Sequence, residues 1–335
     1  MSTVADDMRV GTTTQGTSRL LPGLGFAVLS AMSFGLSGSL AKGLLDSGWT
    51  AGAAVAVRVL LAAAVLAVPA VVSLRGRWGL LRRNAGLVAV YGLVAVAGCQ
   101  LAYFNAVVHM QVSVALLIEY TAPVAVIGWM WLRHGHRPTV LTLAGAVVAA
   151  AGLVLVLDLL SGAALSVPGV LWALGAMAGA ATYFVLSANE DNGLPPLVLA
   201  AAGLSLGAVA LLVAGAVGIV PMHASTAPVS YDGTTVAWWL PLLGLGIVTA
   251  ALSYVTGIAA GRRLGSRLAS FVALLEVLFA LVFAWILLGE LPRTVQVGGG
   301  VLILAGVVVV KLGERGTARA TGASARPVAA GRPRG

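Results

Sequence analysis

The stretch "FAWILLGELPRTVQVGGGVLILAG" (residues 283–306) joins two apolar runs through a short polar turn. A shift of 154 residues places "WMWLRHGHRPTVLTLAGAVVAAAG" (residues 129–152) against it without a gap. Both stretches carry a tryptophan, a glycine before the turn, a proline within it and two glycines seven residues apart. The matched pairs are Trp131 and Trp285, Gly135 and Gly289, Pro138 and Pro292, Gly145 and Gly299, and Gly152 and Gly306. We therefore interpret the chain as two related halves.

The composition indicates a protein that crosses a membrane many times. Only 9% of the 335 residues are charged and 59% are hydrophobic, whereas a soluble domain has about 25% charged residues. Apolar runs recur at a length of about twenty residues, which is enough to span a hydrocarbon core. We predict an all-α polytopic membrane protein with ten transmembrane helices. The predicted spans are approximately residues 22–43, 51–73, 85–107, 111–132, 139–158, 168–188, 196–219, 236–259, 265–288 and 294–312.

The basic residues predict an orientation rather than a nucleic-acid partner. The chain has 20 Lys and Arg against 11 Asp and Glu, and most of them lie between spans, where basic residues mark cytoplasmic loops. If the N-terminus is cytoplasmic, 17 of them face the inside, and Lys42 and Arg293 face the outside. We therefore expect both termini to be cytoplasmic in a bacterial inner membrane. Residues 1–21 and 313–335 lack large apolar runs and are predicted to be disordered tails.

The repeat divides the chain into two units of five spans, at residues 22–158 and 168–312. Because five is odd, the second unit starts on the opposite side of the membrane, so the repeat is inverted. Inverted repeats are typical of secondary transporters, which bind substrate near the midplane between the halves.

The second half resembles the EamA branch of the drug/metabolite transporter superfamily. The resemblance lies in "LLEVLFALVFAW" (274–285), Gly289-Glu290, Gln296 and Gly299. It implies ten helices in a five-plus-five inverted repeat, and it covers about residues 24–312. Two positions depart from the family pattern. Val277 stands where a proline usually follows the acid, and His136 replaces the glutamate of the Gly-Glu pair in the first half.

The stretch "LLIEYTAPV" (116–124) is similar to the threonine/homoserine exporter branch of this family. The resemblance implies secondary active export of a small metabolite such as an amino acid, with proton exchange. Uptake or facilitated diffusion of a drug-like compound or a nucleotide-sugar remains open, as does a membrane partner subunit without transport activity. Nothing in the sequence separates a monomer from a homodimer. We find no nucleotide-binding loop, metal cluster or catalytic group, and so expect no cofactor and no enzyme.

Glu119 is the first candidate for the transport pathway because a charged carboxylate near the bilayer centre costs about 2.5–3.5 kcal/mol. It can serve a substrate amine or a proton, or it can form a fixed ion pair with Arg58, which lies about as deep in the second span. For Arg58 we expect the structural role. Pro123 removes a backbone donor one turn later, so it should free the Glu119 carbonyl and kink the helix.

The other pathway candidates are polar residues inside the predicted spans. Glu276 matches the acid of the resembled family, as a pocket residue or as a packing hydrogen bond. Serines and threonines form stripes on the first and eighth helices, which can line a pocket or bond within helices. The full set is Ser33, Ser37, Gln100, Tyr103, Tyr183, Ser253 and Thr256.

Overall fold

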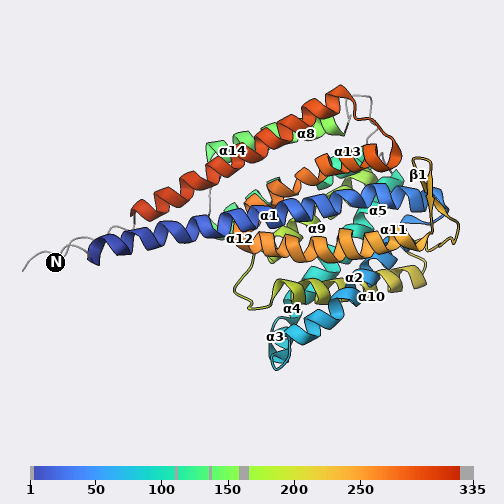
Figure 1. The fold of residues 1–335 in the computed structure, drawn as a ribbon, viewed down its shortest axis with the longest axis horizontal. Coiled ribbons are helices and arrows are strands. Elements are labelled where there is room, and N and C mark those ends of the chain that lie inside the picture. The colour runs from blue at the N-terminus through green and yellow to red at the C-terminus, as the bar shows by residue number, and fades with distance from the viewer. Residues whose placement is uncertain (1–3, 110–111, 136–137, 158–165, 325–335) are drawn as a thin grey trace, which may run out of the picture.

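The computed structural model describes residues 4–109, 112–135, 138–157 and 166–324. Its N-terminal half consists of helices whose order follows the predicted spans (Figure 1). Tyr91–Gly98 is a π-helical segment that continues α4 into α5. The elements are α1 (Val4–Asp46), α2 (Ala51–Ser73), α3 (Trp78–Arg83), α4 (Ala85–Val90), η1 (Tyr91–Gly98), α5 (Cys99–His109), α6 (Val112–Glu119), α7 (Ala122–His134) and α8 (Val140–Val156).

The C-terminal half has the same kinds of helix and adds one small hairpin. A second π-helical segment, η3, joins α11 to α12. The elements are α9 (Val167–Ser187), α10 (Pro196–Ala216), β1 (Val229–Tyr231), β2 (Thr234–Val236), α11 (Trp239–Leu243), η3 (Gly244–Leu252), α12 (Ser253–Ala273), α13 (Leu275–Leu288) and α14 (Thr294–Ser324).

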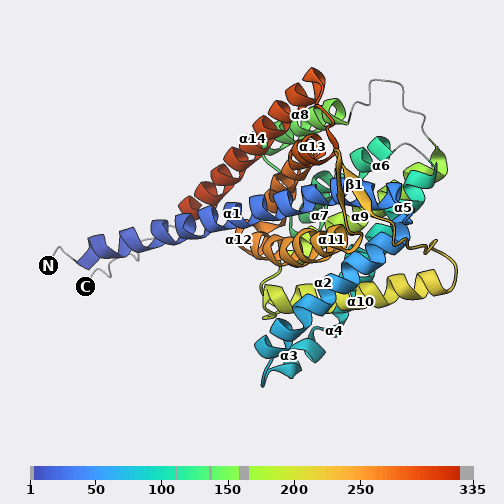
Figure 2. The ribbon, with the colours of Figure 1, turned by 45° about the vertical axis from the view of Figure 1, so that its right-hand side comes forward.

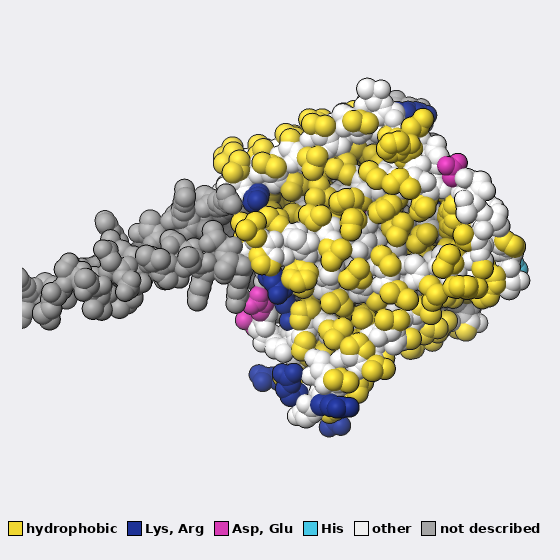
Figure 3. Space-filling view, viewed as in Figure 1, with side chains coloured by type: hydrophobic (Ala, Val, Ile, Leu, Met, Phe, Trp, Pro, Cys, Tyr) yellow, Lys and Arg dark blue, Asp and Glu magenta, His cyan; other side chains and the backbone are white. Residues whose placement is uncertain are grey.

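Within the described residues, eight helical segments are long and apolar enough to cross a membrane, and α8 and α13 are shorter apolar helices. Large apolar side chains are exposed along α8, α10 and α14, and hydrophobic side chains cover most of the face shown in Figure 3. Basic side chains gather at the edge of that face where α3 lies. An apolar band bordered by charge is the surface that a bilayer requires. The structure therefore confirms an all-α polytopic membrane protein.

The predicted eighth and ninth spans are separated at residues 259–265, and two helices meet within α12 at Gly265, whose φ of +78° and ψ of 162° fall outside the helical region. Two other helices extend beyond their predicted spans of 22–43 and 294–312. α1 begins at Val4 and α14 continues to Ser324. Adding one residue to an existing helix costs far less than starting a new one, which is why a span can extend beyond its apolar part.

The hairpin β1–β2 was missed by the sequence analysis. Its signal is the Asp232-Gly233 dipeptide inside "VSYDGTTV", because both residues have positive φ, +36° and +80°, as a tight hairpin turn requires. The hydroxyl of Tyr231 on β1 donates a hydrogen bond of 2.8 Å to the carbonyl of Leu40. The hairpin is thereby fixed to the end of α1 (Figure 1).

The helix pair α8–α14 has the most extensive contact in the structure and lies side by side in both views (Figures 1 and 2). Glycines allow this approach. A Cβ on Gly152 would lie 2.5 Å from the Gly299 carbonyl oxygen, and a Cβ on Gly145 would lie 2.8 Å from that of Gly306. Such small residues let helix backbones touch in lipid. Elsewhere α1 packs against α12 and α13, and α2 packs against α10.

Candidate functional site

A helix break follows Glu119. α6 ends at Glu119 and α7 begins at Ala122, with Pro123 in its first turn. The hydroxyl and the N–H of Thr121 both donate to the Ile118 carbonyl, at 2.6 and 3.1 Å. Proline is well tolerated in the first turn, where its missing N–H has no helical partner to lose. The predicted disruption of the helix at Pro123 is therefore confirmed, and it takes the form of a break between two helices.

A second break lies at the corresponding position of the other half. α12 ends at Ala273, and α13 begins at Leu275 with Glu276 in its first turn. The two acids thus sit at opposite ends of their helices. A helix N-terminus stabilises negative charge and a C-terminus does not, so Glu276 has favourable backbone electrostatics as a carboxylate. Glu119 lacks them and needs a proton or a cation to compensate its charge.

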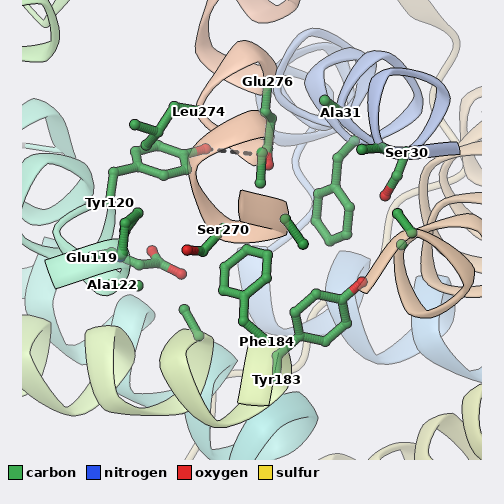
Figure 4. Close-up of a pocket in the computed structure, with 18 of the residues that line it drawn as sticks. Ser30, Ala31, Glu119, Tyr120, Ala122, Tyr183, Phe184, Ser270, Leu274 and Glu276 are labelled. Carbon is green, nitrogen blue, oxygen red and sulfur yellow. Dashed lines mark hydrogen bonds between the residues drawn. The ribbon is translucent and has the colours of Figure 1, made fainter. Parts of the chain in front are cut away.

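Both acids line one cavity, which has an empty volume of about 940 Å³ including its open mouth. The Tyr120 hydroxyl donates a hydrogen bond of 3.0 Å to Glu276 Oε1, and Cys99 Sγ lies 3.5 Å from Glu119 Oε1. Figure 4 shows the Glu119 carboxylate facing the Ser270 side chain, while Tyr120 turns toward Glu276.

Aromatic rings form the opposite wall of the cavity. The ring centroid of Tyr183 lies 5.6 Å from that of Tyr254 and 5.1 Å from that of Phe184. Phe34 lies 5.7 Å from Tyr254 by the same measure. These rings come from α1, α9 and α12, so helices of both halves build the wall. Aromatic rings of this kind hold apolar groups and attract cations over their faces.

Arg58 is buried behind this wall and does not line the cavity. Its guanidinium lies 4.8 Å from the centroid of the Phe34 ring, and Nη2 donates a hydrogen bond of 2.9 Å to the Thr249 carbonyl. Between Arg58 and Glu119, both described, there is no ion pair or hydrogen bond. The alternative of a fixed pair was therefore wrong, because Arg58 links α2 to η3 instead.

The cavity collects five of the ten predicted pathway residues. Glu119, Pro123, Gln100, Tyr183 and Glu276 line it. α1 lines the cavity with Ala27, Ser30, Ala31 and Phe34 rather than with Ser33 or Ser37. The buried Thr256 donates instead to the Leu252 carbonyl, one turn earlier in the chain. The predicted residues that do not line the cavity are Ser33, Ser37, Tyr103, Ser253 and Thr256.

Several lining residues were missed by the sequence analysis. The tyrosines of the sequence could have indicated them, because the chain has only six tyrosines and three of them line the cavity. A phenol hydroxyl inside an apolar span has to find a partner, and the one on Tyr120, next to Glu119 in the chain, finds Glu276. The missed residues with aromatic or polar side chains are Phe34, Cys99, Tyr120, Phe184, Tyr254 and Ser270.

A multi-pass helical bundle that holds half-buried acids and aromatic rings around an open cavity has the architecture of a membrane carrier. The chain matches the EamA-like transporter family over residues 21–158 and 167–312, and it belongs to that family. It is a transporter rather than an enzyme.

Two curated relatives and one solved structure are similar to this chain. A probable terminal-alkyne amino-acid exporter of Streptantibioticus cattleyicolor is 28% identical over 256 residues, covering 72% of this chain and 78% of that protein. An uncharacterized transporter of Archaeoglobus fulgidus is 29% identical over 221 residues, covering 66% and 73%. A protein of known crystal structure superposes with a TM-score of 0.67 at 20% identity, over 88% of this chain and 98% of that one. At that identity the likeness shows the fold alone.

Proposed function

We propose that the protein is a secondary active transporter that exports a small metabolite, such as an amino acid, in exchange for protons. The observation that carries the proposal is Glu119, a carboxyl group that ends a helix inside a cavity with no basic side chain among its described lining residues. A proton or a substrate ammonium group can compensate this carboxylate, but both cannot do so at once. Competition at one acid is the simplest form of exchange.

The transport cycle we propose is alternating access between two inverted repeats of five helices, in a bacterial inner membrane with both termini cytoplasmic. The element bounds support the repeat. A shift of 154 residues superimposes η1 on η3, α7 on α13 and the start of α8 on the start of α14, within one residue. Gly135 and Gly289, which are matched by the same shift, both have a φ of +67°.

The packing of α8 on α14 supports the same symmetry. Gly145 contacts Gly306, and Gly152 contacts Gly299. Exchanging the halves turns the first contact into the second, because Gly145 matches Gly299 and Gly152 matches Gly306. A two-fold axis between the halves requires this relation. With α8 and α13 counted as spans, the structure accommodates ten crossings.

In this mechanism the helices move relative to one another at the helix breaks. Transporters use discontinuous helices at the substrate site because unwound backbone there is exposed to the cavity rather than to lipid. The breaks beside Glu119 and Glu276 let α6 and α7, and likewise α12 and α13, change their relative angle while each remains helical. Protonation of Glu119 would then release substrate on the side to which the cavity is open.

The experiment is counterflow and gradient-driven flux of labelled amino acids in proteoliposomes that contain only the purified chain. Glu119→Gln should abolish the response to a pH gradient. Glu290→Gln is the matched control, because it changes an acid that lies outside the cavity. Flux in wild type that is unchanged by a pH gradient, or a response that survives in Glu119→Gln, would refute proton exchange at this residue.

A further inference from the structure

The described lining of the cavity has acidic side chains and no basic side chain to balance their charge. Glu119 and Glu276 contribute two carboxyl groups, and the described lining includes no Lys, Arg or His. A bound carboxylate would therefore meet two acids and no cation, and burying a charge without a partner is costly. Two buried arginines, Arg58 and Arg267, lie outside this lining. Arg58 lies behind the ring of Phe34 and already donates to the Thr249 carbonyl.

The remaining polar groups extend this preference for positive charge. The Tyr120 hydroxyl donates a hydrogen bond to Glu276, so its oxygen can still accept a hydrogen bond from a ligand. The ring centroid of Tyr254 lies 5.7 Å from that of Phe34 and 5.6 Å from that of Tyr183 along the wall. An ammonium group near these rings gains cation–π attraction, which grows as water is excluded.

We propose that this cavity recognises its substrate by a protonated amine and has no subsite for a carboxylate. Organic ammonium ions with an aromatic or apolar substituent are then substrates in their own right, and an amino acid is accepted for its amine. The proposal rests on the proposed function and names the substrate class of the same site. One proton taken up for one ammonium ion released keeps the charge of the site constant.

The geometry gives each part of such a substrate a place. The ammonium group lies at the Glu119 carboxylate, whose hydrogen-bond neighbour among the described residues is the Cys99 thiol. The apolar substituent lies against Phe184 and Tyr183, across the cavity from Glu119 in Figure 4. The competing interpretation, in which Arg58 binds a carboxylate, requires the Phe34 ring to turn aside first.

Three ligands with the same ring separate the two interpretations. Phenethylammonium carries only the amine, 3-phenylpropionate carries only the carboxylate, and L-phenylalanine carries both. Binding to the purified full-length chain in nanodiscs is measured by calorimetry, for wild type, Glu119→Gln, Arg58→Lys and the control Glu290→Gln. We expect phenethylammonium to bind at least as tightly as L-phenylalanine, with 3-phenylpropionate not binding. We expect Glu119→Gln to weaken the amine at least tenfold, and Arg58→Lys and Glu290→Gln to change it less than twofold.

Binding of 3-phenylpropionate, or binding of L-phenylalanine without binding of phenethylammonium, would overturn the proposal in favour of a carboxylate subsite. Absence of binding by all three ligands to folded wild type would overturn it as well. Failure of the proposed function is a different result, since the amine would then bind with the expected selectivity while the proteoliposomes move no substrate. A melting curve for each variant shows whether it is folded.

Discussion

Replacing Gly299 by alanine tests how closely α8 and α14 must approach. A Cβ at this position would lie 2.6 Å from the carbonyl oxygen of Gly152 and 2.8 Å from the backbone nitrogen of Val156. Both neighbours are backbone atoms, so no side chain can rotate away. Ordinary contact begins at 3.4 Å, and the two helices would therefore have to separate locally by roughly 0.8 Å. Overpacking of this kind costs about 1–3 kcal/mol.

Gly298→Ala is the matched control, because a Cβ on Gly298 meets nothing within 4 Å. Both substitutions change the same helix by the same methyl group, so the helix propensity gained from replacing glycine cancels between them. The difference in stability between the two variants is then the cost of separating α8 from α14. At about 2.1 cal/mol/K per residue for the entropy of unfolding, 1–3 kcal/mol corresponds to a Tm difference of roughly 1–4 °C in this chain.

Cys99 provides the assay. It is the one cysteine of the chain, and only 7% of its surface is exposed, so a thiol-reactive dye in detergent solution reports the temperature at which the bundle opens. Gly299→Ala should melt below Gly298→Ala. Equal melting temperatures for the two variants would refute the reasoning, because they would mean that α8 and α14 separate at no cost.

Three further outcomes are expected. Gly257→Ala should weaken ligand binding with little change in melting temperature, because its Cβ would lie 2.0 Å from the Tyr183 hydroxyl and push that ring into the cavity; unchanged affinity would contradict this. Lys42 and Glu290 form an ion pair with side chains 50% exposed, so a double-mutant cycle on melting should give a coupling below about 1 kcal/mol, and a larger value would show that solvent screens it less than its exposure implies. Burial raises the pKa of Tyr231 from 10.0 to about 12, so the stability that the neutral phenol contributes should persist below pH 10 and be lost as the pH rises through 12. Comparing alkaline ultraviolet titrations of wild type and Tyr231→Phe tests that range, and a Tyr231 component that titrates near pH 10 would contradict it.

Hydropathy and spacing located most helices because both are local properties of the chain. The span predicted at residues 51–73 agrees with α2, Ala51–Ser73, at both ends. The hairpin was missed although Asp232-Gly233 marks its turn, because the mostly apolar composition of the chain predicts helices. The separation predicted between the eighth and ninth spans is present as a break at Gly265. Length and hydropathy show where one span ends, but not how many residues end it.

For the candidate site, too, some features follow from local sequence and others from tertiary packing. The sequence by itself determined that Glu119 and Glu276 are acids within apolar spans, that Pro123 disrupts a helix beside one of them, and that two halves repeat. It could not determine which side of each helix faces the cavity. Tertiary packing placed Tyr120 on Glu276 and gave Arg58 a carbonyl partner instead of Glu119. The physical reason is that desolvation of a charge follows from the apolar span around it, whereas its partner depends on how several helices rotate against one another.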